Sequence, residues 1–213
     1  MSCPICGKRP PKRFCPARGE KICAICCGQE REVTIDCAPD CSYLIAAHRY
    51  EAEHRKLVSS GDVAYRDVFV AVDFVYEHWP VVGGIAATVL NLQREHRDMR
   101  DSDAIAAVEA LAETYRTLGT GIYYERPPEL PVALSLYSAI GHFLQEFRKS
   151  ESARAGFVTL KDSDMFHILI FLLRLAKQET TSRPRSQAFL DFLRQRFPLP
   201  AQPEREAPRI IVP

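Results

Sequence analysis

The sequence opens with Met1-Ser-Cys3-Pro-Ile-Cys6-Gly7, continues to Cys23-Ala-Ile-Cys26-Cys27-Gly28, and reaches Cys37-Ala-Pro-Asp-Cys41. Together with Cys15, these stretches hold all eight cysteines of the 213 residues. Zn²⁺ binds about four thiolates in a tetrahedral arrangement, and a Cys-x-x-Cys pair offers two of them from one tight turn. The clustering therefore predicts a zinc-binding module at the N-terminus.

Disulfides are the main alternative use of so many cysteines. The N-terminal residues contain no apolar run followed by a cleavage site, so we expect the chain to stay in a reducing compartment. Thiols remain free there, which favours zinc over disulfides or redox-active thiols.

The spacing also predicts how the ligands are shared. If the two Cys-x-x-Cys turns bind one ion, the first site consists of Cys3, Cys6, Cys23 and Cys26. The remaining cysteines interleave with this set along the chain, and they are Cys15, Cys27, Cys37 and Cys41. Interleaved sets indicate a crossed brace with two zinc ions.

His48 is an alternative ligand for the second ion. It follows Cys41 by two helical turns of a predicted helix and could replace Cys27. Four thiolates already complete a tetrahedral site, so we interpret His48 instead as a surface or packing residue.

The run Cys-x2-Cys-x8-Cys-x7-Cys-x2-Cys, with Gly-Glu-Lys-Ile before Cys23, resembles a B-box zinc finger. The resemblance covers residues 3–26 and implies a crossed brace of two zinc ions that serves protein–protein interaction. This chain departs from the B-box pattern in two places. Arg18 stands where a B-box has an acidic ligand, and Cys37 and Cys41 stand where it has two histidines.

The loop between the two Cys-x-x-Cys turns is basic. Residues 8–21 carry six cationic side chains against the single acid Glu20, a net charge of +5. Such a patch can contact phosphates of nucleic acid. However, two tetrathiolate zinc sites would carry about −4, so charge neutralisation explains the patch better. The cations are Lys8, Arg9, Lys12, Arg13, Arg18 and Lys21.

The residues that follow predict a strand and then a helix. Residues 31–36 alternate polar and β-branched side chains, which is typical of a short strand. Asp40 suits a helix N-cap, and the helix should run to about Val58. Strand, ligand and helix in this order are similar to a treble clef. The predicted buried stripe of the helix is Tyr43, Ala47, Tyr50, His54 and Leu57.

The remainder predicts a mainly α fold, with the zinc module at 1–43, a helical bundle at 44–197 and a Pro-rich, disordered tail at 198–213. The most apolar helix should begin after Asp162 or Ser163 and lie at the centre of the bundle. The other predicted helices span 62–79, 82–97, 103–118, 131–149 and 186–196.

Composition and motifs narrow the function. With 46% hydrophobic residues and a net charge of +1, the sequence is globular and shows no overall preference for nucleic acid or membranes. It has no His-Glu-x-x-His, phosphate-binding glycine loop or Gly-x-Ser-x-Gly. We therefore expect a non-catalytic, cytoplasmic zinc protein that binds or scaffolds another protein. The alternatives are nucleic-acid binding through Lys8, Arg9, Lys12 and Arg13, and then a zinc- or thiol-dependent enzyme.

Overall fold

The computed structural model describes residues 2–54, 63–158 and 160–199. The fold is mainly α, as the sequence predicts, with a small cysteine-rich part at the N-terminus. This part contains β1 (Arg13–Cys15), β2 (Glu20–Ile22), α1 (Ala24–Glu30) and, after it, α2 (Ser42–Glu53). The helices of the bundle are α3 (Val72–Glu77), α4 (Trp79–Glu95), α5 (Asp101–Leu118), α6 (Pro131–Ala155), α7 (Asp162–Glu179) and α8 (Ala188–Arg196).

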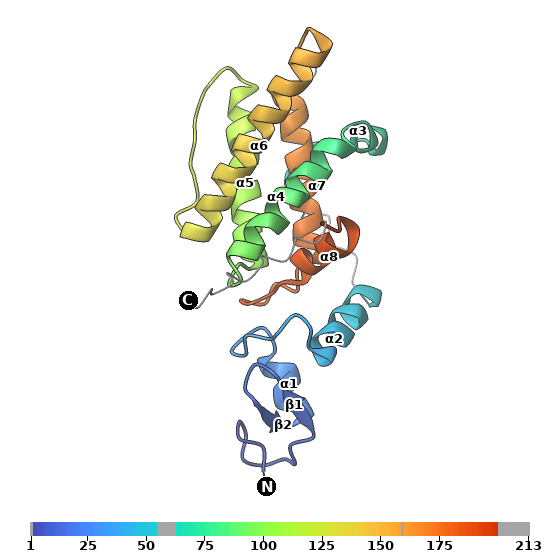
Figure 1. Cartoon of the computed structure of the whole chain (residues 1–213), viewed down its shortest axis with the longest axis vertical. Helices are drawn as coiled ribbons and strands as arrows, with labels where there is room; N and C mark the ends of the chain where they lie inside the picture. The colour runs from blue at the N-terminus through green and yellow to red at the C-terminus, as the bar shows by residue number, and fades with distance from the viewer. Residues whose placement is uncertain (1, 55–62, 159, 200–213) are drawn as a thin grey trace, which may run out of the picture.

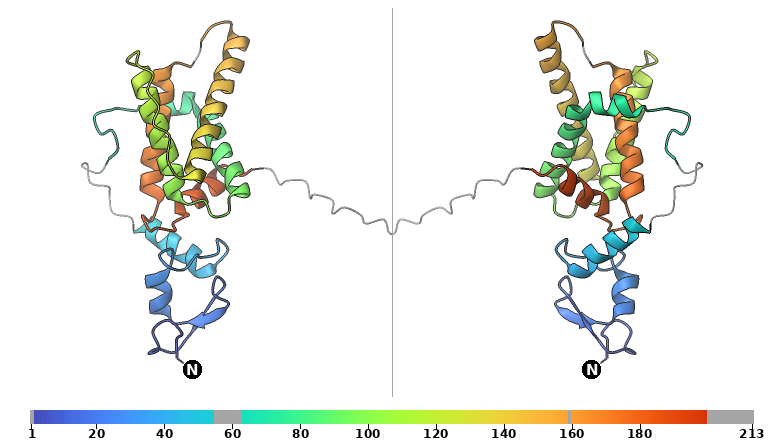
Figure 2. Two further views of the ribbon diagram at one scale, coloured as in Figure 1. Left: turned by 90° about the vertical axis from the view of Figure 1, so that its left-hand side faces the viewer. Right: turned by 90° about the vertical axis from the view of Figure 1, so that its right-hand side faces the viewer.

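The two parts lie end to end (Figure 1). The antiparallel pair β1–β2 and α1 form one end of the molecule, and α4 to α7 form the other. In both side views of Figure 2, α2 and α8 lie at the junction between them. We call residues 2–41 the zinc module and residues 63–199 the bundle.

The core of the bundle is built around α7. This helix buries Met165, Ile168, Leu169, Ile170, Leu172, Leu173 and Ala176. It packs most extensively against α5 and also contacts α8 and α4. A helix that is apolar on most sides needs neighbours on most sides, and α7 shares the core with α5, which contacts α6, α7 and α8.

The starts of α5 and α7 are close to the predicted ones, but their caps differ. Ser102, which we expected to cap the helix predicted at 103–118, and Asp162 and Ser163, the candidates for the next cap, all lie inside the helices and do not cap them. Instead, the backbone N–H of Arg100 donates to Asp103 Oδ2 (2.8 Å), and that of Lys161 donates to Asp164 Oδ2 (2.9 Å). Each aspartate lies in the first helical turn, where its charge also complements the helix dipole.

The predicted helix at 62–79 is wrong for most of its length. Of the described residues 63–79, those of α3 and Trp79, the first residue of α4, are the α-helical ones. The Arg174 guanidinium of α7 donates to the carbonyl oxygens of Ala64 (3.0 Å), Tyr65 (2.7 Å) and Val68 (2.7 Å). Tyr65 also has a positive φ of 51°. A tertiary contact thus takes carbonyl groups that a helix would use, which periodicity cannot reveal.

The predicted strand at 31–36 is also wrong. The backbone N–H groups of Val33, Thr34 and Ile35 all point to the Glu30 carbonyl oxygen, at 3.0–3.2 Å, which makes this segment a turn after α1. Glu32 has a positive φ of 55°, and only an isolated bridge joins Arg31 to Ile35. The two strands that do form, β1 and β2, were not predicted.

The face that α2 turns inward differs from the predicted stripe. Leu44 is the buried residue of this helix, whereas Tyr50 is 61% exposed. Leu57 lies outside the described residues, as do the predicted end of the helix and the tail from residue 200 onward. No described helix is long and apolar enough to cross a membrane.

Candidate metal centre

A tight turn places the first two cysteines side by side. The backbone N–H of Gly7 donates to the Cys3 carbonyl oxygen (2.7 Å), and that of Cys3 donates to the Arg9 carbonyl oxygen (2.8 Å). Gly7 has φ 64°, a conformation that costs glycine little. The turn therefore presents Cys3 and Cys6 to the same point.

The other pair lies where β2 passes into α1. Cys23 is the N-cap of α1, and its Sγ accepts a hydrogen bond from the Cys26 N–H (3.4 Å). The Cys23 N–H in turn donates to Cys3 Sγ (3.3 Å). Because β1 and β2 form a hairpin, the end of β2 returns to the first turn, and both Cys-x-x-Cys pairs meet.

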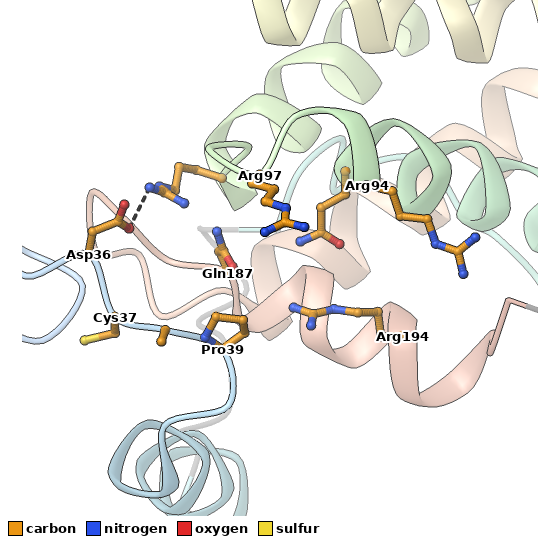
Figure 3. Close-up of a pocket in the computed structure, with 10 residues that line it drawn as sticks. Asp36, Cys37, Pro39, Arg94, Arg97, Gln187 and Arg194 are labelled. Carbon is orange, nitrogen blue, oxygen red and sulfur yellow. Dashed lines mark hydrogen bonds and ion pairs between the residues drawn. The ribbon is translucent and has the colours of Figure 1, made fainter. Parts of the chain in front are cut away.

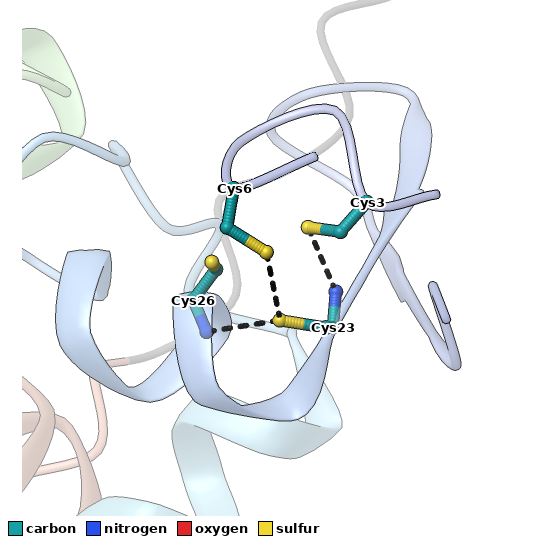
Figure 4. A group of neighbouring side chains, drawn as sticks. All are labelled: Cys3, Cys6, Cys23 and Cys26. Carbon is teal, nitrogen blue, oxygen red and sulfur yellow. Dashed lines mark hydrogen bonds between the residues drawn. The ribbon is translucent and has the colours of Figure 1, made fainter. Parts of the chain in front are cut away.

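The four thiols Cys3, Cys6, Cys23 and Cys26 form the metal centre (Figure 4). Their sulfur atoms all lie within 4.8 Å of one another, with 4.0 Å between Cys6 and Cys23. Tetrahedral zinc with Zn–S bonds of about 2.3 Å requires sulfur atoms about 3.8 Å apart. The geometry therefore suits an ion such as Zn²⁺, and the first predicted ligand set is the one that converges.

Hydrogen bonds and burial act on these thiols in opposite directions. The backbone N–H of Lys8 lowers the pKa of Cys6 to about 6. Burial opposes ionisation of Cys3, but the backbone N–H groups of Cys23 and Cys6 outweigh it and lower the pKa. Burial and the neighbouring thiols raise the pKa of Cys26 to about 12. A divalent cation would supply the positive charge that ionisation of all four thiols requires.

The other four cysteines are less tightly gathered. Cys15, Cys27 and Cys37 pack in the same small core as the metal centre. Burial raises the pKa of Cys37, and the neighbouring Cys15 and Cys41 thiols add to this effect. Within residues 2–54, 63–158 and 160–199, however, no second group of metal ligands lies as close together as the first. A second ion therefore stays a prediction.

His48 lies among carboxylates. Its Nε2 is 3.1 Å from Glu32 Oε1 and its Nδ1 is 3.4 Å from Asp191 Oδ2 of α8. Although burial lowers the pKa of His48, hydrogen bonds to Asp191 and Glu32 outweigh it and raise the pKa to about 9. A protonated imidazole cannot bind a metal, so the contacts favour the packing role over the ligand role.

Glu32 is the central residue of the junction, and the sequence did not single it out. It is only 2% exposed. Its backbone carbonyl oxygen accepts from the Arg185 N–H (2.8 Å), and its carboxylate accepts from the Gln187 N–H (3.2 Å) and the Thr181 hydroxyl (3.3 Å). One residue of the zinc module thus satisfies donors of the loop that joins α7 to α8.

Two further contacts support the same docking. Arg100 Nη2 forms an ion pair with Asp36 (2.6 Å). Arg183 donates to the Arg31 carbonyl oxygen (3.1 Å) and to Glu51 Oε1 of α2 (3.4 Å). No local pattern marks these residues as a set, because each pair joins residues more than 60 positions apart.

The basic loop is divided in the structure. Arg13 donates to Cys27 Sγ (3.7 Å) and lies over the Tyr43 ring, and Arg18 pairs with Glu20 (2.7 Å). Lys8, Arg9 and Lys12 are exposed. Part of the loop therefore stabilises the module itself, and part faces solvent.

No family model matches the chain, and neither a curated protein nor a solved structure does. The tetracysteine cluster agrees with a zinc finger, while the resemblance to a B-box rests on residue spacing alone.

Proposed function

We propose that this chain is a non-catalytic zinc protein whose zinc module acts as a protein-interaction platform held on the helical bundle. The observation that carries the proposal is the closed set of four thiols at the centre of the module. Cys3, Cys23 and Cys26 are at most 4% exposed. Catalytic zinc keeps three protein ligands and an open position for water, whereas structural zinc has four protein ligands.

The surface of the module favours a protein partner. Phe14 of β1 is 54% exposed and Ile25 of α1 is 46% exposed, although the module buries few apolar residues of its own. Exposed apolar side chains on a small domain are available for burial against another protein. We therefore assign the interaction surface to Phe14 and Ile25.

A second zinc ion completes the proposal, with Cys15, Cys27, Cys37 and Cys41 as its ligands. Three of these cysteines already share one small core, and the pKa of Cys37 is raised first by burial and then, after the effects of Glu32, by Cys15 and Cys41. The turn of Glu32 lies between Cys27 and Cys37 of this set. An ion there would hold the turn and thereby the docking of the module on the bundle.

The stoichiometry of bound zinc tests the second ion. Native mass spectrometry of zinc-loaded protein should give two ions per chain, with one remaining in Cys37→Ser and one in Cys6→Ser. A wild-type ratio of one, unchanged by Cys37→Ser, would remove the second site and leave the first intact.

Nucleic-acid binding is the second candidate, because Lys8, Arg9 and Lys12 are exposed on the module. Arg13 supports it less, since its guanidinium contacts Cys27 and Tyr43. Phosphate contacts would make the affinity fall steeply with salt, with a log–log slope of roughly 0.9 for each duplex phosphate neutralised.

An affinity pull-down from cell extract, with and without nuclease, separates the two candidates. We expect a specific protein that is retained after nuclease treatment, lost with the double variant Phe14→Ser/Ile25→Ser and kept with the matched triple variant Lys8→Gln/Arg9→Gln/Lys12→Gln. If nuclease treatment abolishes capture, and if the triple variant loses the captured material while the double variant keeps it, the nucleic-acid alternative is established. Zinc content must equal that of the wild type in every variant.

A further inference from the structure

A cavity of about 640 Å³ lies where the zinc module meets the bundle (Figure 3). One wall is residues 36–39 of the zinc module, and the others are the C-terminal end of α4 with the turn that follows it, the start of α5, and α8. This volume falls within the range of about 300 to 1,000 Å³ that is typical of small-molecule sites.

The cavity is strongly cationic. Its lining includes four arginines, Arg94, Arg97, Arg100 and Arg194, and Asp36 is the one acidic residue among the described lining residues. Asp36 pairs with Arg100 (2.6 Å), and Arg194 pairs with Asp191, which lies outside the lining. Two guanidinium groups are thus compensated, and the lining keeps an excess of positive charge.

Arg97 differs from these two residues. It lies in the turn between α4 and α5, is exposed, and has no ion pair or hydrogen bond with the part of the chain that the structure describes. Figure 3 shows it across the cavity from Arg194 and Pro39, whereas the Arg94 side chain extends away from it. The like charges of Arg97 and Arg194 repel each other across the cavity, and an anion between them removes that cost.

The chemistry of the lining defines the anion. Guanidinium groups offer two parallel N–H donors that match phosphate oxygens. Gln93 and Gln187 add amide groups, whereas none of the described lining residues is aromatic. Recognition of single-stranded nucleic acid relies on aromatic side chains for stacking, so this lining recognises phosphate groups and not bases.

We propose that the cavity binds a small, multiply phosphorylated anion, with Arg97 and Arg194 donating to its phosphate oxygens. Because the walls come from both parts of the protein, the bound anion also joins the zinc module to the bundle. This inference does not depend on the protein partner of the zinc module.

Isothermal titration calorimetry with inorganic pyrophosphate, on the full-length zinc-loaded protein at fixed ionic strength, tests the proposal. We expect Arg97→Gln to weaken binding at least tenfold. Asp36→Asn should tighten it severalfold, because it removes the acid from the lining and frees Arg100. The matched control Lys12→Gln removes one charge from the zinc module and should leave the affinity within twofold.

Asp36→Asn is expected to raise the affinity for pyrophosphate, whereas Arg97→Gln is expected to lower it. Misfolding cannot explain a gain in affinity, because a damaged protein would not bind more tightly. Absence of pyrophosphate binding to the wild type would overturn the proposal, as would equal losses in Arg97→Gln and Lys12→Gln. If a DNA duplex binds more tightly than pyrophosphate and Arg97→Gln abolishes that binding, the ligand of the cavity is nucleic acid and not a small anion.

Discussion

The zinc module and the bundle differ in the size of their buried cores and therefore in what can stabilise them. The bundle buries a contiguous core that runs through α4, α5, α6, α7 and α8. The buried core of the module has six described residues, and four of them are cysteines, with Ile22 and Ile35 as the others. A core of that size cannot offset the conformational entropy of the chain, so we expect metal coordination to stabilise the module.

Metal removal should produce the largest difference in stability between the zinc module and the bundle. Structural zinc contributes about 10 to 16 kcal/mol in small zinc-finger peptides, far more than the module's own burial supplies. With a chelator or with Cys6→Ser, hydrogen exchange should show loss of protection in residues 3–41 and unchanged protection in α5, α6 and α7. Loss of protection throughout these helices would mean that the bundle does not fold independently.

A core substitution in the bundle gives the reciprocal test. Leu169 of α7 is fully buried, so Leu169→Ala should lower the free energy of unfolding of the bundle by about 2 to 5 kcal/mol. Denaturant unfolding followed by far-ultraviolet circular dichroism measures the change. Zinc content should stay at the wild-type value, and a decrease would show that the bundle supports the metal centre.

Glu32 tests how the two parts are joined. Glu32→Gln keeps the shape of the side chain but removes the charge that faces His48, and should weaken docking by about 1 to 3 kcal/mol. Limited proteolysis should then cut the chain between α2 and α3 faster, with zinc content and the unfolding of the bundle unchanged. The exposed Glu53→Gln, on α2, is the matched control and should behave like the wild type.

The smallest expected effect is on pH dependence. The folded pKa of His48 is about 9, above its ordinary value of 6.5, because the hydrogen bonds to Asp191 and Glu32 outweigh burial. Its contribution to docking is therefore complete below about pH 6.5 and is lost as the pH rises through 9. Because solvent screens the partly exposed imidazole, we expect a change of roughly 1 kcal/mol. The rate of the same proteolytic cut should rise over this range in the wild type and stay flat in His48→Gln. An equal rise in both would assign the pH dependence to other groups.

Local patterns predicted the elements with strong periodicity and failed where tertiary contacts act on the backbone. The burial of α7 follows from its apolar residues alone, and the four thiols of the first site follow from two Cys-x-x-Cys turns. The helix expected before Trp79 is shortened because Arg174, about 110 residues away, binds its carbonyl groups. The strand expected at 31–36 is a turn because three N–H groups converge on the Glu30 carbonyl oxygen.

The sequence by itself therefore determined that this chain has a cluster of four cysteines able to hold a metal and a helical bundle, because both depend on spacing over a few residues. Only the tertiary structure decided how they meet. The hydrogen-bond partners of Glu32 lie 149 and 155 positions away, and the arginines of the cavity come from two segments of the bundle, residues 94–100 and Arg194 of α8. Contacts of that range depend on how whole elements pack, and no local period or spacing encodes them.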